Sequence, residues 1–143
     1  MTQQYNEAPI VYQGSCLCGA IRYEIRGDIG AILHCHCQRC RKATGTAFAT
    51  NASVKKIDFY FLSGEDHLKK YVSSATTERY FCADCGSPMI ATKADAPDIY
   101  RIRLGSLDTP ISHRPSMHVF VADQAEWDHI TDDLPQFAQF PSS

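Results

Sequence analysis

The sequence has no hydrophobic run long enough to cross a membrane. A membrane-spanning helix needs about 18 or more consecutive apolar residues, and no segment of the 143-residue chain reaches that length. Residues 1–14 also lack a basic start followed by an apolar stretch. We therefore expect neither a secretory signal nor association with a membrane.

An excess of positive charge is also missing. The chain has 14 Lys and Arg against 16 Asp and Glu, a formal net charge of −2 with its six His neutral. Dedicated nucleic-acid binders usually carry a strong positive excess, so nucleic acid is not the expected partner. No linker, low-complexity tract or internal repeat divides the chain. The length suits one hydrophobic core, and we expect a single domain over residues 1–143.

Helical periodicity is scarce, and two-residue alternation dominates. Apolar and polar residues alternate over 21–25, 100–104 and 118–121, as in half-buried strands. Aromatic residues that favour strands fill 56–62 and 78–81. Frequent Gly, Pro and Asp turn signals separate these runs. The pattern predicts an all-β fold of short antiparallel strands.

Two segments depart from the strand pattern. Residues 38–43, followed by Gly45, are expected to form one short helical turn. Residues 134–141 are too proline-flanked for a helix. We expect an extended segment there, with Phe137 and Phe140 packed into the surface.

Cysteine is the residue that stands out, with seven in the chain. An odd number excludes complete pairing in disulfides. Without a signal sequence we expect a cytoplasmic, reducing environment, where clustered cysteines more often bind metal or react. The seven form three groups: Cys16 and Cys18; Cys35, Cys37 and Cys40; and Cys82 and Cys85.

The spacing within the groups is typical of metal ligands. Two groups contain a pair separated by one residue, whose sulfurs point the same way in an extended chain. Two groups contain a pair separated by two residues, the spacing of a zinc knuckle. Gly19 and Gly86 each follow a cysteine directly, and a glycine there allows the chain to turn under a metal with a positive φ.

These seven residues divide into one set of four and one of three. Four thiolates complete a structural zinc site, and three leave one coordination position open for substrate, as in a catalytic zinc. The four are Cys16, Cys18, Cys82 and Cys85; the three are Cys35, Cys37 and Cys40. Alternatively His34 or His36 closes the second site, although strand alternation points both away from it. The remaining alternatives to metal binding are that the cysteines are inert buried thiols or form disulfides.

An open site of three thiolates favours a particular chemistry. Its net charge of −1 weakens activation of water and suits a soft fourth ligand, a substrate thiol. A thiol held as thiolate adds to an aldehyde, and the reverse reaction breaks a carbon–sulfur bond. Arg39, Arg41 and Lys42 follow this triad and are candidates to bind substrate carboxylates. A solvated basic turn and a local nucleic-acid contact are the alternatives for these cations.

At three places the sequence resembles a known family, the glutathione-dependent formaldehyde-activating enzymes, also called the centromere protein V/Gfa domain. The motifs that carry the resemblance are GSCLCGAIRY at 14–23, CHCQRCRKATG at 35–45 and FCADCGSP at 81–88. Residues 118–127 and 132–137 fit its late segments, so the resemblance covers about residues 12–137. It implies a zinc-containing, tent-like fold, with the four-cysteine set as structural zinc site and the three-cysteine set as second zinc site.

The resemblance also implies an activity, the formation of S-hydroxymethylglutathione from glutathione and formaldehyde. We therefore predict a zinc-dependent carbon–sulfur lyase acting on a glutathione–aldehyde adduct or a related thiol. The catalytic group is Cys35, Cys37 and Cys40. A non-catalytic carrier, a chromatin- or RNA-associated zinc module and a purely structural two-zinc domain are the alternatives. The sequence does not indicate an oligomeric state.

Overall fold

A computed structural model describes residues 11–141 of the chain. A three-stranded sheet has the order β1 (Val11–Ser15), β2 (Arg22–Arg26), β5 (Phe59–Ser63). A seven-stranded sheet has the order β10 (Met117–Val119), β3 (Ile32–Cys35), β4 (Ala49–Lys55), β9 (Ala96–Arg103), β8 (Pro88–Lys93), β7 (Thr77–Cys82), β6 (Leu68–Ser74). The helical elements are α1 (Gln38–Thr44) and the 3-10 turns η1 (Lys56–Asp58), η2 (Glu65–His67), η3 (Leu104–Ser106) and η4 (Val121–Asp123).

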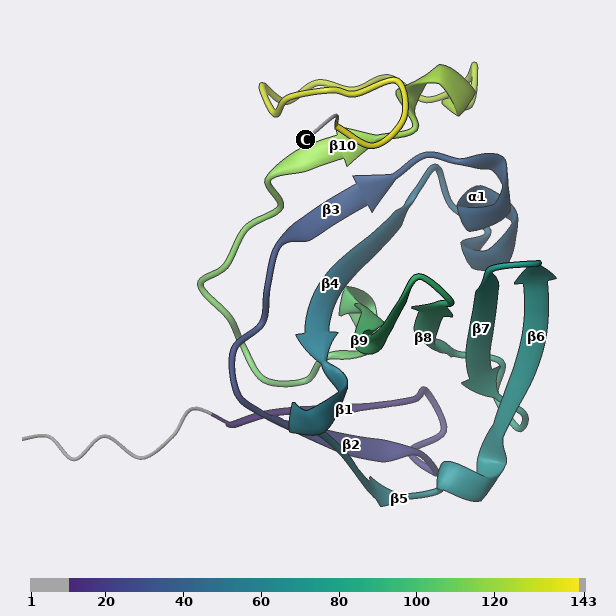
Figure 1. Cartoon of the computed structure of the whole chain (residues 1–143), viewed down its shortest axis with the longest axis vertical. Coiled ribbons are helices and arrows are strands. Elements are labelled where there is room, and N and C mark those ends of the chain that lie inside the picture. Colours follow the sequence, from purple (N-terminus) through teal and green to yellow (C-terminus); the bar gives the residue numbers. More distant parts are fainter. Residues whose placement is uncertain (1–10, 142–143) are drawn as a thin grey trace, which may run out of the picture.

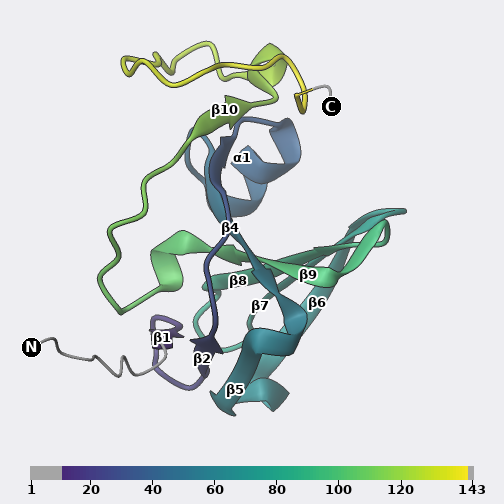
Figure 2. The same ribbon diagram turned by 60° about the vertical axis from the view of Figure 1, so that its left-hand side comes forward.

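The larger sheet curves, with α1 near one end of β6 and β7 and the C-terminal segment beyond β10 (Figure 1). The three-stranded sheet lies at the end of the molecule away from that segment (Figure 2). The predicted all-β class is confirmed. The exception to antiparallel pairing within the described residues is β10, which pairs in parallel with β3. Because these strands are far apart in the sequence, a crossover connection can join them in parallel.

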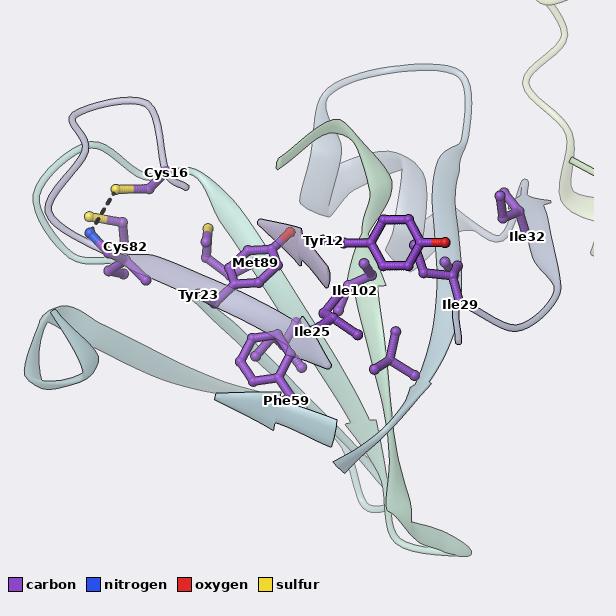
Figure 3. Packing of buried hydrophobic residues seen from close by; sticks show 14 residues of the cluster. Tyr12, Cys16, Tyr23, Ile25, Ile29, Ile32, Phe59, Cys82, Met89 and Ile102 are labelled. Carbon is purple, nitrogen blue, oxygen red and sulfur yellow. Dashed lines mark hydrogen bonds between the residues drawn. The ribbon is translucent and has the colours of Figure 1, made fainter. Parts of the chain in front are cut away.

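The hydrophobic core lies between the two sheets. Tyr23 and Ile25 of β2 project from the small sheet, and Ala52 of β4 and Ile102 of β9 project from the large one. All four are at most 1% exposed. Figure 3 shows this packing, with Cys16 and Cys82 together at one end of the cluster. The two-residue alternation therefore places one face of each strand in the core.

The opposite face of the large sheet is polar and basic. Arg101 and Arg103 lie on either side of the core residue Ile102 in β9. Across the sheet Arg101 lies opposite Ala91 of β8, and Ala91 lies opposite Arg79 of β7. Side chains of a row share one face, so three arginines of two strands gather on one side.

The predicted helical turn is confirmed as α1. It begins after Cys37, whose side chain accepts a hydrogen bond from the backbone N–H of Cys40, and it ends at Gly45. Arg41 and Lys42 occupy the last turn, where cations interact favourably with the carbonyl end of a helix. The same cysteine thus both caps the helix and belongs to a candidate metal site.

The segment after η4 is extended and partly follows the prediction. Phe137 is half-buried beside Cys35 and Val119, and its N–H donates to the carbonyl oxygen of His118. The prediction for Phe140 is wrong, since its side chain stays 47% exposed and contacts Phe120 edge-on. No helix of the described residues is long and apolar enough to span a membrane.

Gly64 gives a test of the packing between β5 and the loop before β2. Its φ is +74°, and a Cβ there would overlap the carbonyl of Ala20. We expect Gly64→Ala to lower the free energy of unfolding by about 2 kcal/mol or more. Gly105→Ala is the matched control, because a Cβ there meets no atom within 4 Å. Equal thermal unfolding of the two variants would contradict the expectation.

Candidate functional site

The first cysteine group joins the N-terminal loop to the loop between β7 and β8. Sulfurs of Cys16, Cys18, Cys82 and Cys85 all lie within 4.8 Å of one another. The Sγ atoms of Cys16 and Cys18 are 3.6 Å apart, and those of Cys18 and Cys82 are 3.8 Å apart. A tetrahedral zinc with bonds of about 2.3 Å places its sulfurs about 3.8 Å apart. The four residues therefore have the geometry to hold one metal ion.

Two tight turns set this geometry. The N–H of Gly19 donates to the carbonyl oxygen of Cys16, and the N–H of Gly86 donates to that of Cys82. Both glycines have a positive φ, 80° and 79°, as their positions after cysteines predict. The backbone N–H of Ile21 also donates to Cys16 Sγ over 3.3 Å. Backbone hydrogen bonds thus hold both loops in their turns without any contribution from a metal ion.

The second group lies where β3 ends and α1 begins. Cys35, Cys37 and Cys40 place their sulfurs within 4.8 Å of one another. Cys35 and Cys40 are buried, while Cys37 is partly exposed. Hydrogen bonds from the thiols of Cys35 and Cys37 lower the pKa of Cys40, and Arg79 lowers it further. Hydrogen bonding to Cys37 and Cys40, with burial, raises the pKa of Cys35. A bound cation would neutralise the three sulfurs and allow all of them to lose their protons.

A cavity of about 350 Å³ opens onto this second group. It lies over the basic face of the large sheet and is bounded on one side by the C-terminal segment. Its lining residues are Leu33, Cys35, Cys37, Gln38, Arg39, Cys40, Asn51, Ser74, Thr77, Arg79, Ala91, Lys93, Arg101, Arg103, Phe120, Asp123 and Phe140. The metal group is thus reached from a cleft of the size small-molecule sites have.

Positive charge dominates the cavity wall. Five cations line it, namely Arg39, Arg79, Lys93, Arg101 and Arg103, against the single carboxylate of Asp123. Among residues 11–141 none of the five forms an ion pair. The cavity therefore favours an anionic ligand.

The structure separates the three cations that the sequence singled out. Arg39 lines the cavity, whereas Arg41 and Lys42 are not among its lining residues. The other four cations of the cavity lie on β7, β8 and β9 and were not predicted from the sequence. The alternation along β9 predicts that its arginines share one face. Which face borders the cavity depends on pairing with strands distant in the sequence.

Arg103 is a buried cation at the cavity wall. Its side chain is 7% exposed and donates a hydrogen bond to Asn51 Oδ1. Burial lowers its pKa, while the nearby thiolates of Cys40, Cys35 and Cys37 act in the opposite direction. A buried charge needs a compensating partner, and the cysteine group supplies it.

Histidines lie behind the cysteine group rather than in it. Neither His34 nor His36 belongs to the group of metal-ligand geometry, so histidine closure of the site is not supported. His34 Nδ1 lies 2.8 Å from Thr50 Oγ1, and burial with the nearby His118 lowers its pKa to about 4. His36 is fully buried, and its Nε2 lies 2.8 Å from Nδ1 of His118.

His118 links this cluster to the C-terminal segment. Its Nε2 lies 3.0 Å from a carboxylate oxygen of Asp132, and it is 2% exposed. His36, His118 and Asp132 therefore form a chain of contacts between the segment after η4 and the residue between two candidate metal ligands, Cys35 and Cys37.

Comparison with known proteins identifies the family. Residues 11–123 match the family model described as glutathione-dependent formaldehyde-activating enzyme. The chain belongs to this family. All seven cysteines fall within the matched range, so both cysteine groups are part of what the formaldehyde-activating family model covers.

Relatives in the formaldehyde-activating family are distant. An uncharacterized lyase of Schizosaccharomyces pombe is 30% identical over 91 residues, 64% of this chain and 64% of that protein. A protein of Aspergillus flavus, provisionally named a glutathione-dependent formaldehyde-activating enzyme, is 27% identical over 130 residues, 90% of this chain and 59% of that protein. The chain thus spans about three-fifths of the length of these curated relatives.

A solved structure supports the fold of this family member. The crystal structure of a Rhodobacter sphaeroides protein superposes with a TM-score of 0.59 at 24% identity. The match covers 70% of this chain and 91% of that one. The similarity shows that the two chains share a fold.

The histidine cluster can be tested by His118→Ala. Removing this buried ring leaves a cavity and leaves His36 Nε2 without its contact, so we expect a loss of about 3 kcal/mol in the free energy of unfolding. His129→Ala is the matched control, because His129 is exposed. Chemical denaturation of both variants gives the comparison. A loss within about 0.5 kcal/mol for His118→Ala, as expected of a surface site, would show that the cluster does not stabilise the fold.

Proposed function

We propose that this protein is a zinc-dependent carbon–sulfur lyase that acts on an adduct of an aldehyde with glutathione or a related anionic thiol. The observation that carries the proposal is the group Cys35, Cys37 and Cys40, three sulfurs at one wall of a cation-lined cavity. The names of the curated relatives, a lyase and a glutathione-dependent formaldehyde-activating enzyme, support the same chemistry.

The two cysteine groups would hold zinc in different roles. Four cysteines, Cys16, Cys18, Cys82 and Cys85, complete a tetrahedral shell and suit a structural ion. Three cysteines leave a position for substrate, and zinc held there supplies a soft Lewis acid that favours the thiolate form of a thiol. All seven cysteines are free of disulfides, as the proposed reducing, cytoplasmic setting requires.

The protein's own cations would orient the substrate. Glutathione carries two carboxylates, and Arg39, Lys93 and Arg101 line the cavity without ion-pair partners among the described residues. Charge-assisted hydrogen bonds from these side chains fix carboxylates at a distance from the reacting sulfur. Positioning of this kind turns the encounter of thiol and aldehyde into a reaction of aligned partners.

The bond changes are simple. In the lyase direction the carbon–sulfur bond of the adduct breaks, and its electron pair stays on sulfur. The hydroxyl proton leaves to water first, and the carbon–oxygen double bond forms as the sulfur departs. In the reverse direction the sulfur pair attacks the aldehyde carbon, and the oxygen takes up a proton from water.

Metal content tests the division of the cysteines. We expect two zinc ions per chain in the purified protein, and one in Cys37→Ser with little change in unfolding temperature. Cys82→Ser should lose the other zinc and unfold at a lower temperature, because its site joins distant parts of the chain. Metal analysis with thermal unfolding gives both results. Loss of stability in Cys37→Ser equal to that in Cys82→Ser would indicate two structural ions instead.

Activity is tested by the exchange of glutathione between free and formaldehyde-bound forms. We expect acceleration over buffer by the protein and none by Cys37→Ser, since this variant removes one of the three sulfurs. A buffer blank is essential because thiols and formaldehyde combine spontaneously. Exchange no faster than the blank would reject the lyase and favour a carrier.

Arg101 tests substrate binding. Arg101→Gln removes a cation from the cavity wall while leaving the cysteines in place. We expect KM for the glutathione adduct to rise about tenfold with little change in kcat, corresponding to a lost contact with a carboxylate. Arg22→Gln, an exposed arginine of β2, serves as the control with unchanged kinetics. An unchanged KM in Arg101→Gln would place the substrate carboxylates elsewhere.

A further inference from the structure

Arg79 differs from the other cations of the cavity by touching a candidate metal ligand. Its Nη2 lies 3.7 Å from the Sγ of Cys40, a hydrogen-bond distance for sulfur. Its Nε donates to Ser73 Oγ over 3.1 Å. Ser73 lies where the pairing of β6 with β7 is irregular, and such irregularities commonly re-aim side chains next to functional sites. The guanidinium is therefore fixed at two of its nitrogens.

The third nitrogen of Arg79 has no protein partner. Nη1 is buried and makes no hydrogen bond to any residue in the range 11–141. Leaving a buried donor unsatisfied costs about 1–3 kcal/mol, more for a charged group. Such groups in native proteins call for an explanation, and a ligand is one. Arg79 lines the cavity, so an acceptor bound there lies beside its guanidinium.

The surroundings identify the acceptor as negatively charged or polarised. Arg79 and Arg103 line the same cavity, and neither arginine has a carboxylate partner among the described residues. Two guanidinium groups on the wall of one cavity favour an oxygen that carries or develops negative charge.

We propose that Nη1 of Arg79 donates a hydrogen bond to the oxygen of the aldehyde adduct, the atom that gains charge when sulfur and carbon join or separate. The inference rests on the proposed lyase function and assigns a catalytic residue to it. In an adduct this oxygen is two bonds from the sulfur. A substrate sulfur placed beside Cys40 therefore brings the oxygen toward the guanidinium that already contacts Cys40.

Arg79 keeps its proton throughout the reaction. As sulfur attacks the aldehyde, the electron pair of the carbon–oxygen double bond moves to oxygen, which becomes an alkoxide and then takes a proton from water. In cleavage the oxygen loses that proton to water before the carbon–sulfur pair returns to sulfur. The hydrogen bond from Arg79 stabilises the alkoxide in both directions, since charge develops there only during the reaction.

The test compares Arg79→Gln and Arg79→Lys with the unchanged protein and with the Arg22→Gln control. We expect Arg79→Gln to lower kcat for glutathione–formaldehyde exchange about 100-fold, the effect of removing one such donor, with KM changed less than about twofold. Arg79→Lys should recover part of kcat, because a lysine keeps the charge but not the planar fork that serves two acceptors. Arg101→Gln provides the opposite pattern, a raised KM.

Zinc affinity gives a readout that does not depend on activity. Because Arg79 contacts Cys40, we expect Arg79→Gln to weaken the zinc of the three-cysteine group about tenfold in competition with a chelator. The kinetics are measured at saturating zinc so that occupancy does not differ. A kcat for Arg79→Gln within about threefold of the unchanged protein would overturn the inference and leave the lyase proposal standing. An unchanged protein no faster than buffer would overturn both.

Discussion

Sulfur atoms in groups of three and four lie within 4.8 Å of one another at two places in this protein. Thiolates at such a distance repel, and in the second group hydrogen bonds between the sulfurs lower the pKa of Cys40 and raise that of Cys35. A bound cation turns the repulsion into attraction. The loops that carry the cysteines therefore hold like charges close together, and the two sheets support those loops.

The large sheet supports them by giving its two faces different tasks. On one face Ala52 and Ile102 close the core against the smaller sheet. On the other face Arg79, Arg101 and Arg103 line the cavity that opens onto the sulfurs of the second group. Since strand side chains alternate, the core residue Ile102 of β9 lies between Arg101 and Arg103, which line the cavity. Stability and ligand binding are thus encoded in alternate positions of the same strands.

The parts predictable from sequence are those set by short-range geometry. Cysteines separated by one or two residues can aim at one point in an extended chain or a tight turn, and Gly19 and Gly86 adopt the positive φ their positions indicate. Helix α1 likewise follows from a local signal, the position of Gly45 after residues 38–43.

The parts that were missed depend on pairing between distant strands. Arg79 reaches Cys40 across 39 positions, and His118 reaches His36 across 82. Nothing near either residue in the sequence marks it. Phe140 shows the same limit, since an aromatic residue in an extended tail is buried only if a surface happens to receive it.

The long reach of His118 also bears on the order in which the molecule is built. Strand β10 pairs with β3, and its residues His118 and Val119 contact His36, which lies between Cys35 and Cys37. During synthesis the early cysteines emerge well before these partners. Their contacts with residues late in the chain therefore form late. For that interval the thiols lack their final neighbours. The nascent chain therefore depends on ambient redox conditions and metal supply before its own architecture can protect them.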